Sequence, residues 1–532
     1  ARVSRGYGWL VKKVIRFGAL VGIMYVALLG LTGLQFATTP SGYVPSQDKQ
    51  YLVAFAQLPD ASSLERTDAV IKEMSRIALE QPGVISSVAF PGLNINGFTN
   101  SPNSGIVFTT LSDFNERTDP SMSADAIAAA LNQKFAGIED AFIAIFPPPP
   151  VQGLGTIGGF RLQIQDRASH GYDELYNVTM QVMQKAWATP ELTGIFSSYQ
   201  VNVPQLDLDV DRTKAKQQNV SVDEIFQTLQ AYMGSLYVND FNQFGRTYQV
   251  NIQADEQFRQ SASQISQLKV RNGHGEMVPL GSFINVTDTT GPDRVMHYNG
   301  FTTAEINGGP APGYSTGEAQ AAIEKILAET LPNGMTYEWT ELTYQQILAG
   351  NAGVFIYPLV IMLVFMVLAA QYESLSLPLA IILIIPMTLL SALSGVLIYG
   401  GDNNILTQIG LIVLVGLATK NAILIVEFAK ELQDQGMSVM EAILEAGRLR
   451  LRPILMTSIA FIMGVVPMVF STGAGAEMRQ AMGVAVFSGM IGVTFFGLIL
   501  TPLFYYMLAK RGEKKALQAS TATNDKLETN HA

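Results

Sequence analysis

Six long apolar segments divide this chain and restrict it to membrane-spanning folds. One lies near the amino terminus and five crowd the last third, at about 15–36, 351–371, 376–399, 404–428, 453–472 and 483–508. Each has about twenty residues, enough for a helix to cross the hydrocarbon core of a bilayer. Of the 532 residues, 48% are hydrophobic and only 15% are charged, whereas soluble domains carry about 25% charged residues. The sequence therefore predicts an α-helical membrane domain of six transmembrane helices, one plus five.

The polar stretch 40–350 between the first and second segments has the pattern of an α/β domain. Its spacing predicts, in order, strand 51–56, helix 62–79, strands 84–90 and 106–111, helix 123–135 and strand 141–146. This βαββαβ order is that of a ferredoxin-like unit. A second unit begins near Phe160 and is interrupted by a β-rich insertion at about 203–290, so the two units occupy about 40–202 and 291–345. The alternative is a generic α/β domain without a repeat.

Lysine and arginine placement predicts the orientation of the segments in the membrane. Basic residues crowd the segment 1–14 and the loop 430–452, and Lys510 and Arg511 open the tail 509–532. Such residues mark cytoplasmic ends, so we expect the domain 40–350 on the opposite, periplasmic side. The polar tail lacks periodicity and is expected to be disordered. Because the chain begins with alanine and not methionine, we expect it to be part of a longer chain.

Composition excludes several kinds of function. The chain has no cysteine and four histidines, no two of which are close enough in sequence to suggest a metal motif. A net charge of −10 without a large basic block argues against nucleic-acid binding. No nucleophile–base pair or HExxH motif is found, so an enzyme is not expected.

Lys420 is the most informative residue, because it is the one cation inside the apolar run 405–428. A lysine at a helix centre costs about 2.5–3.5 kcal/mol on insertion scales and needs an anionic partner or water. No apolar run contains an interior Asp or Glu, and Glu427, on the same face, lies at the membrane edge. Ion or proton translocation is therefore one interpretation; the other is that the side chain extends to the headgroups.

Three further polar residues lie near this level. Arg450 and Thr457 are seven residues apart and share a helix face with Gly464, which suits a water-lined entry from the cytoplasm. The alternatives are an ordinary basic anchor for Arg450 and a bond back to its own helix for Thr457. Asn421 could orient the Lys420 ammonium or serve packing.

Aromatic residues flank a glycine-rich loop in the polar stretch. Phe90 and Phe108 stand on either side of 91–105, which contains Phe98 and the glycines Gly92, Gly97 and Gly105. Flexible loops with aromatic side chains at their base suit adaptable apolar binding. The alternative is that both phenylalanines belong to a core at strand ends.

Five sequence motifs resemble those of the resistance–nodulation–division (RND) drug efflux pumps, in the hydrophobe/amphiphile branch. They are GLATKNAILIVEFA at 416–429, RLRLRPILMTS at 448–458, SLYVNDF at 235–241, GEMVP at 275–279 and STGAG at 471–475. The resemblance covers about 8–510 and is to the C-terminal half of such pumps, whose two halves each have one helix, a large periplasmic loop and five helices.

The resemblance implies a proton-driven antiporter subunit of the Gram-negative inner membrane that expels drugs, dyes and detergents. Lys420 would match a relay lysine that pairs with two aspartates of the first half, and Thr457 and Arg450 would match relay positions. The two repeated units would be porter subdomains and the insertion a docking subdomain. Implied partners are the N-terminal half, two further copies in a homotrimer, a periplasmic adaptor, an outer-membrane channel, amphiphilic substrates and membrane lipids. No cofactor is implied, because the proton motive force supplies the energy.

Pocket residues also follow from the resemblance. Phe90 and Phe108 would lie in a deep pocket, Phe146 near an access pocket, and 91–105 would be the switch loop between them. Ile95 and Gly97 occupy positions that such pumps often fill with phenylalanine, which leaves the substrate range open. The remaining alternatives are a proton-driven protein-export motor, against which the insertion argues, and soft-metal efflux, which the scattered methionines do not favour.

Overall fold

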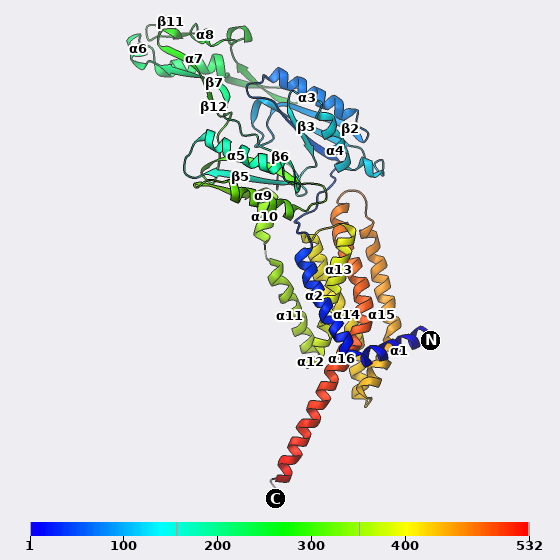
Figure 1. Cartoon of the computed structure of the whole chain (residues 1–532). Helices are drawn as coiled ribbons and strands as arrows, with labels where there is room; N and C mark the ends of the chain where they lie inside the picture. The colour runs from blue at the N-terminus through cyan, green and yellow to red at the C-terminus, as the bar shows by residue number, and fades with distance from the viewer. Residues whose placement is uncertain (1, 156–157, 351, 530–532) are drawn as a thin grey trace.

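The computed structural model describes residues 2–155, 158–350 and 352–529. A bundle of long helices carries two sheet-containing units at one end, and a smaller subdomain projects beyond them (Figure 1). Within the described residues, six helices are long and apolar enough to cross a membrane. They are α2 (Gly18–Thr38), α11 (Ala352–Tyr372), α12 (Ser376–Ile382) continued by α13 (Ile385–Tyr399), α14 (Ile405–Asp434), α15 (Val439–Val469) and α16 (Ala476–Thr529).

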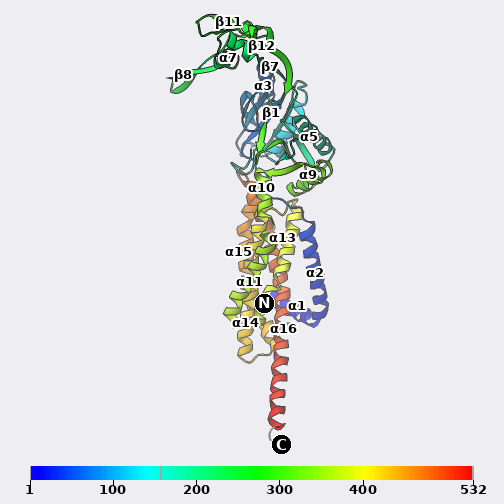
Figure 2. The same ribbon diagram turned by 90° about the vertical axis from the view of Figure 1, so that its left-hand side faces the viewer.

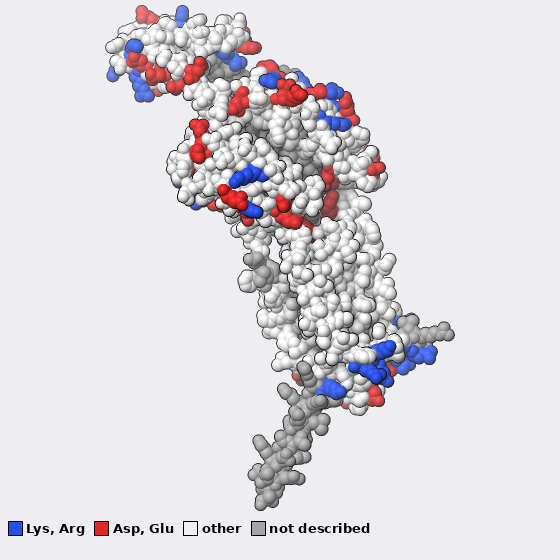
Figure 3. All heavy atoms as spheres, in the orientation of Figure 1, with Lys and Arg blue, Asp and Glu red and all other residues white. Residues whose placement is uncertain are grey.

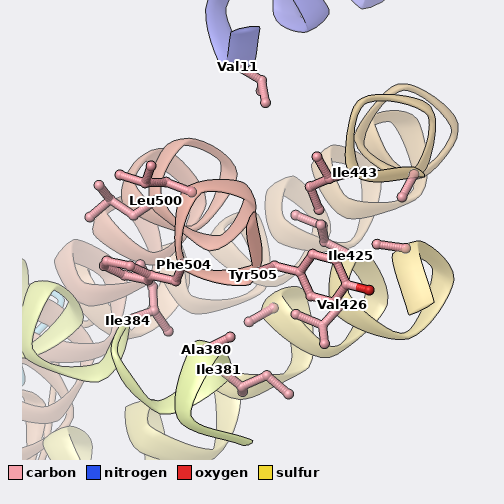
Figure 4. Packing of buried hydrophobic residues seen from close by; sticks show 14 of the residues in the cluster. Val11, Ala380, Ile381, Ile384, Ile425, Val426, Ile443, Leu500, Phe504 and Tyr505 are labelled. Carbon is pink, nitrogen blue, oxygen red and sulfur yellow. The ribbon is translucent and has the colours of Figure 1, made fainter. Parts of the chain in front are cut away.

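Helix α16 forms the centre of the bundle, because it packs against α13, α14 and α15. Tyr505 of α16 is 2% exposed, lies beside Ile425 and Val426 of α14 (Figure 4), and donates from its hydroxyl to Gln433 Oε1 at 2.9 Å. Helices α2, α11 and α15 are peripheral and bury few of the residues in their apolar spans. Three of the six helices therefore present wide apolar faces outward.

The basic segment at the amino terminus is a helix, α1 (Arg2–Arg16), that lies across the foot of the bundle (Figures 1 and 2). It buries Tyr7, Val11 and Ile15 against the bundle core and leaves Lys12 and Lys13 exposed. This apolar–basic division is typical of a helix in a membrane interface.

The tail differs from the sequence-based expectation. Disorder was expected after about 509, but α16 continues as helix to Thr529, and residues 530–532 lie outside the described part. Lysine, alanine, leucine, glutamine and glutamate are frequent there, and their high helix propensity lets an existing helix continue without further nucleation.

The first sheet-containing unit has the predicted βαββαβ order. Its elements are β1 (Tyr51–Gln57), α3 (Leu64–Leu79), β2 (Val84–Leu93), β3 (Asn100–Leu111), α4 (Ala124–Phe135) and β4 (Phe142–Phe146). The antiparallel sheet has the strand order β2-β3-β1-β4. Even-numbered residues of β1, such as Leu52 and Ala54, pack under α3 and α4, so its odd-numbered residues face away from the helices.

The second unit repeats this arrangement with a long interruption. Its elements are β5 (Phe160–Asp166), α5 (Tyr172–Trp187), β6 (Leu192–Phe196), β13 (Met296–Tyr298), β14 (Phe301–Pro310), α9 (Thr316–Thr330) and β15 (Met335–Thr340), after which α10 (Glu341–Ala349) leads to the membrane helices. Strand β14 lies between β6 and β5, and β15 forms the edge, so the four main strands have the same order as in the first unit. The sequence analysis missed β14, because Glu305, Asn307 and two glycines obscure its alternation.

The insertion is carried on a two-stranded arm. Strands β7 (Val203–Val210) and β12 (Ile284–Gly291) pair along their whole length, from Val203 with Gly291 to Val210 with Ile284. These bounds agree closely with the expected insertion. Beyond the arm lie α6 (Arg212–Gln217), α7 (Val222–Leu229), β8 (Leu236–Gln243), β9 (Arg246–Ile252), α8 (Ala262–Ile265), β10 (Lys269–Arg271) and β11 (Met277–Pro279), with a small core of their own.

Asp166 closes the turn from β5 to α5 and makes this turn sensitive to acid. Its side chain is 4% exposed and accepts hydrogen bonds from His170 Nδ1 at 2.9 Å, Gly171 N at 3.1 Å and Ala168 N at 3.2 Å. Burial alone would raise the pKa of Asp166, but these hydrogen bonds hold it below the usual 3.8.

We predict that Asp166→Asn removes this acid sensitivity. A lowered folded-state pKa contributes stability that is complete above pH 3.8 and is lost as the pH falls through the folded-state value. At neutral pH the variant should be less stable by about 1–3 kcal/mol, because the Asn NH2 group, a donor, replaces one acceptor oxygen of Asp166 beside buried donors. Hydrogen-exchange mass spectrometry of the β5–α5 peptides at neutral and acidic pH measures both effects, and an unchanged acid response would contradict the assignment.

Candidate functional site

Lys420 lies on an open face of the helix bundle. Its side chain is exposed, on a stripe of α14 that also includes Val413, Gly416 and Glu427. Among the residues that the structure describes, its ammonium makes no ion pair or hydrogen bond. The expected acidic partner is thus not supplied by the described part of the chain, and the lysine faces a side of the bundle that nothing in it covers.

Thr457 is exposed on the neighbouring helix α15. Its hydroxyl donates to the Ile454 carbonyl at 3.1 Å, which is the bond within its own helix that the sequence analysis gave as an alternative. Arg450 is half-buried, with its guanidinium carbon 4.3 Å from the centre of the Phe428 ring. The buried Nε of Arg450 has no hydrogen-bond partner among the described residues, so this side chain retains an unused donor.

A buried polar contact aligns these two helices. Asn421 Nδ2 donates to Ser458 Oγ at 3.0 Å, and both residues are buried. Asn421 therefore has a packing partner on α15, and Ser458, which the sequence analysis did not single out, is that partner. Because the bond sets residues 421 and 458 at one level, their exposed neighbours Lys420 and Thr457 also lie at one level.

The first sheet presents an aromatic face. Strand register places Phe108, Val53 and Phe146 in one row across β3, β1 and β4, and Phe55 belongs to the next row. Phe90 meets Phe108 edge to face, with ring centroids 5.9 Å apart. The structure thus brings together three of the expected pocket residues, Phe90, Phe108 and Phe146, and leaves Phe90 43% exposed.

Phe55 and Phe196 were missed in the sequence analysis and are central to this face. Phe196 comes from β6 of the second unit, and its ring centroid lies 4.1 Å from that of Phe55 and 6.2 Å from that of Phe146. The alternation of strand 51–57 places Phe55 beside Val53, so its orientation was available from the pattern. Phe196 could not be found in that way, because the contact joins different units.

The segment 91–105 is largely a hairpin and only in small part a loop. Gly92 belongs to β2 and Gly105 to β3, where a side chain at residue 105 would overlap Ile71. Only 94–99 lies outside the strands, and this turn is closed by the hydrogen bond from Asn94 N to Thr99 O at 2.8 Å. The strands are longer than expected because Leu93 pairs with Asn100. Gly97 is thus the one glycine of the three that lies in the turn.

The two apolar residues at the hairpin tip, Ile95 and Phe98, differ in burial. Ile95 is 2% exposed and packs with Phe55 and Phe196, whereas Phe98 is 51% exposed. Phe98 also has a positive φ of 51°, which is uncommon for a bulky residue. Of the expected pocket residues, Phe98 alone is therefore turned out of the aromatic cluster.

Polar residues join the hairpin tip to the second unit. Asn96 Nδ2 donates to Glu305 Oε1 at 2.8 Å and to Ser198 Oγ at 2.9 Å, and Ser198 also bonds to Glu305. Arg294 donates to Ser198 Oγ at 2.6 Å and pairs with Asp293. Burial, and then the nearby Asp293 carboxylate, raise the pKa of Asp60 at the edge of this network.

A small polar pocket adjoins this network. It has a volume of about 200 Å³ and is lined by Asn96, Arg161, Gln163, His297, Tyr298 and Glu305, among others. Both amide atoms of the buried Asn307, on the same face of β14 as Glu305, lack a hydrogen-bond partner within the described ranges. The two sheets thus contribute an aromatic face and a polar face to the region between the units.

The chain matches the AcrB/AcrD/AcrF family over residues 1–509. It is 37% identical to the probable efflux pump membrane transporter TtgB of Pseudomonas putida over 530 residues, which cover 99% of this chain and 50% of that protein. It is 35% identical to the multidrug export protein AcrF of Escherichia coli over 492 residues, covering 92% of this chain and 47% of that one. The chain spans about half the length of these relatives. Together with the six apolar helices, these matches show that it is a multi-pass membrane protein that belongs to the AcrB/AcrD/AcrF family.

Proposed function

We propose that this chain forms the C-terminal half of a proton-driven antiporter that expels amphiphilic and hydrophobic compounds. It would lie in the inner membrane with the two sheet-containing units in the periplasm, and would move substrates toward an outer-membrane channel. The observation that carries the proposal is the exposed Lys420 in the apolar span of α14, which pairs with none of the residues in the described ranges. A charge in that position requires an acidic partner, and the open face beside it is where an N-terminal half that supplies two aspartates would pack.

Protonation of those aspartates would couple the membrane potential to movement of α14. When the acids are charged they attract Lys420, and when they are neutral the attraction is lost. Each charge that moves through 100 mV supplies about 2.3 kcal/mol, which exceeds the roughly 1.4 kcal/mol of a tenfold change in affinity. Movement of one proton is therefore sufficient to switch a binding pocket. Arg450 and Thr457, on the same side of the bundle, would hold water on the cytoplasmic path.

The aromatic face supports a hydrophobic substrate class. Relatives carry names such as multidrug/solvent efflux pump membrane transporter and toluene efflux pump membrane transporter. Phe90, Phe108 and Phe146 would line the binding region, with Ile95 in its wall and the turn at Gly97 as the moving part of the switch. The polar pocket beside Glu305 would accept the polar end of an amphiphilic compound. This substrate class also distinguishes the proposal from soft-metal efflux.

The segment 39–50 supports mechanical coupling between the bundle and both sheet units. Tyr43 O accepts from Ile405 N, at the start of α14, at 3.0 Å, and Ser41 O accepts from Gly317 N, at the start of α9, also at 3.0 Å. Asp48 forms a buried ion pair with Arg117 of the first unit. A shift of α14 would thus reach both units through one short segment of backbone.

The inserted subdomain supports assembly with other proteins. The hairpin of β8 and β9 is exposed along both strands, including Phe244, which is 85% exposed. A hairpin that exposes several large apolar side chains indicates an interaction surface, and we propose that it is covered by the other copies of a homotrimer, a periplasmic adaptor and the outer-membrane channel. The insertion also argues against a protein-export motor.

Lys420→Met should abolish efflux by the complete pump, because the acids of the other half would lose their cation. Accumulation of a fluorescent dye in cells measures this, with trimer formation and membrane level as controls. Lys430→Met removes the same charge ten residues along α14, at its cytoplasmic end, and should leave efflux unchanged. Normal efflux by the Lys420 variant would refute the proposal.

Phe108→Ala should change resistance unequally across compounds, because substrates of different shape would make different contacts with the Phe108 ring. The matched variant is Phe135→Ala in α4, where the side chain is 1% exposed in the core of the same unit. That change should lower protein abundance and all resistances together. Minimum inhibitory concentrations for a panel of compounds, normalised to protein level, separate the two patterns. A uniform loss for Phe108→Ala would assign this ring to the core.

Gly42→Val should reduce efflux several-fold while the pump still assembles. A Cβ at residue 42 would lie 1.7 Å from Asp402 Oδ2, so the Asp402 side chain, which accepts from Asn404 Nδ2 at 2.7 Å, must move away from the segment 39–50. Gly33→Val, on α2 where a Cβ meets nothing within 4 Å, is the matched control. Dye efflux per assembled trimer measures the effect, and equal activity of the two variants would remove the segment from the coupling path.

A further inference from the structure

An open groove lies between α2 and α16 at the foot of the bundle. Its volume is about 690 Å³. One wall is open because Gly18, Ala19 and Gly22 of α2 have small or no side chains, and the opposite wall is formed by Leu503, Tyr506 and Met507 of α16. Arg16, the last residue of α1, stands at its mouth.

The groove is confined to one half of the bilayer. Its lining on α2 runs from Gly18 to Val26, which is about 12 Å at 1.5 Å per residue. The hydrocarbon core is about 30 Å thick, so one leaflet accounts for about 15 Å. The groove therefore has the depth of an acyl chain in a single leaflet, and it is too short to seat a helix that crosses both.

The mouth of the groove lies at the headgroup level and is positively charged. The Lys13 ammonium lies 4.1 Å from the centre of the exposed Trp9 ring, and tryptophan on an interfacial helix marks that level. Lysine and arginine side chains gather at this end of the bundle, whereas the visible surface of its membrane-spanning part shows almost no charge (Figure 3). Arg16 is exposed and makes no ion pair with any described residue.

We propose that this groove is a binding site for an anionic phospholipid of the cytoplasmic leaflet. The lipid phosphate would accept hydrogen bonds from the Arg16 guanidinium, with Lys12 and Lys13 adding to the local potential. One acyl chain would lie along Gly18 and Gly22 against Leu503 and Met507. Basic pockets between membrane helices on the cytoplasmic side recognise such headgroups, and the apolar wall distinguishes a lipid from a free phosphate ion.

A second groove on α15 has a similar form but a different setting. It has a volume of about 580 Å³ and is lined by Arg448, Arg452, Leu455 and Met456, among others. Arg448 at this groove pairs with Glu445 at 3.6 Å, whereas Arg16 makes no ion pair with any described residue. The lipid site is therefore assigned to the groove beside Arg16.

The charge requirement is tested on the complete pump in nanodiscs of phosphatidylcholine with a small fraction of phosphatidylglycerol. Native mass spectrometry counts the phosphatidylglycerol molecules that stay bound. Arg16→Gln should weaken retention about fivefold, the equivalent of one cation near the membrane surface. Arg16→Lys should retain most of it, and Arg5→Gln, which removes an exposed charge of α1 outside the groove, should leave it unchanged.

The shape requirement is tested with two glycines of the same helix. A Cβ on Gly22 or on Gly33 meets nothing within 4 Å, so a larger side chain can leave the backbone at either position without a clash at its first carbon. Gly22→Leu fills the groove and should remove the tightly held lipid, whereas Gly33→Leu, outside the groove, should not. Equal lipid retention by wild type, Arg16→Gln and Gly22→Leu would overturn the site. Co-purification of a membrane polypeptide in place of phosphatidylglycerol would also overturn it.

Discussion

A single ammonium in an apolar span is the constraint on which the organisation of this bundle depends. Lys420 is exposed on α14 and none of the described residues supplies a carboxylate partner for it. A charge at that depth is costly unless it is neutralised. The surrounding helices do not enclose it. Helix α16 packs at the centre against α13, α14 and α15, while α14 and α15 leave the side of Lys420 and Thr457 open. The bundle is therefore closed around α16 and open on the side of Lys420.

The two sheet units share one topology and differ in the chemistry of the face that lies away from their helices. In the first unit that face carries Val53, Phe55 and Phe108, and in the second it carries Gln163, Glu305 and Asn307. The same topology thus presents an apolar sheet face in the first unit and a polar sheet face in the second. The amphiphilic compounds proposed as substrates have both kinds of surface, which is why the proposal places them in the region between the units.

Much of this organisation follows from local sequence patterns, and the parts that do not have identifiable physical causes. The six apolar segments, the first βαββαβ unit and the insertion at 203–291 each have a periodicity or composition that can be read within a short window. The sequence analysis missed strand β14 because the buried polar residues Glu305, which bonds to the first unit, and Asn307 interrupt its alternation. The sequence analysis missed the helical tail because its polar composition was interpreted as disorder despite its high helix propensity.

The site residues show the same division between local and distant information. Lys420, Phe90 and Phe108 were singled out by residue type and position and Phe146 by the family resemblance, and the structure brings the three phenylalanines to one sheet face. The contacts of Phe196 with Phe55 and of Ser458 with Asn421 join residues 141 and 37 positions apart. The hydrophobic periodicity of a short segment cannot predict contacts between residues so far apart in the sequence. Similarly, the pairing of Leu93 with Asn100 converts most of an expected loop into strand.

The arm formed by β7 and β12 gives the outer subdomain a particular mechanical freedom. Each strand has eight residues, or about 27 Å at 3.4 Å per residue, and no third strand pairs with them in the described sheet. A ribbon of two strands twists more readily than a wide sheet. In the proposed assembly, the ribbon would take up torsion between a held outer subdomain and the sheet units without breaking a strand pairing.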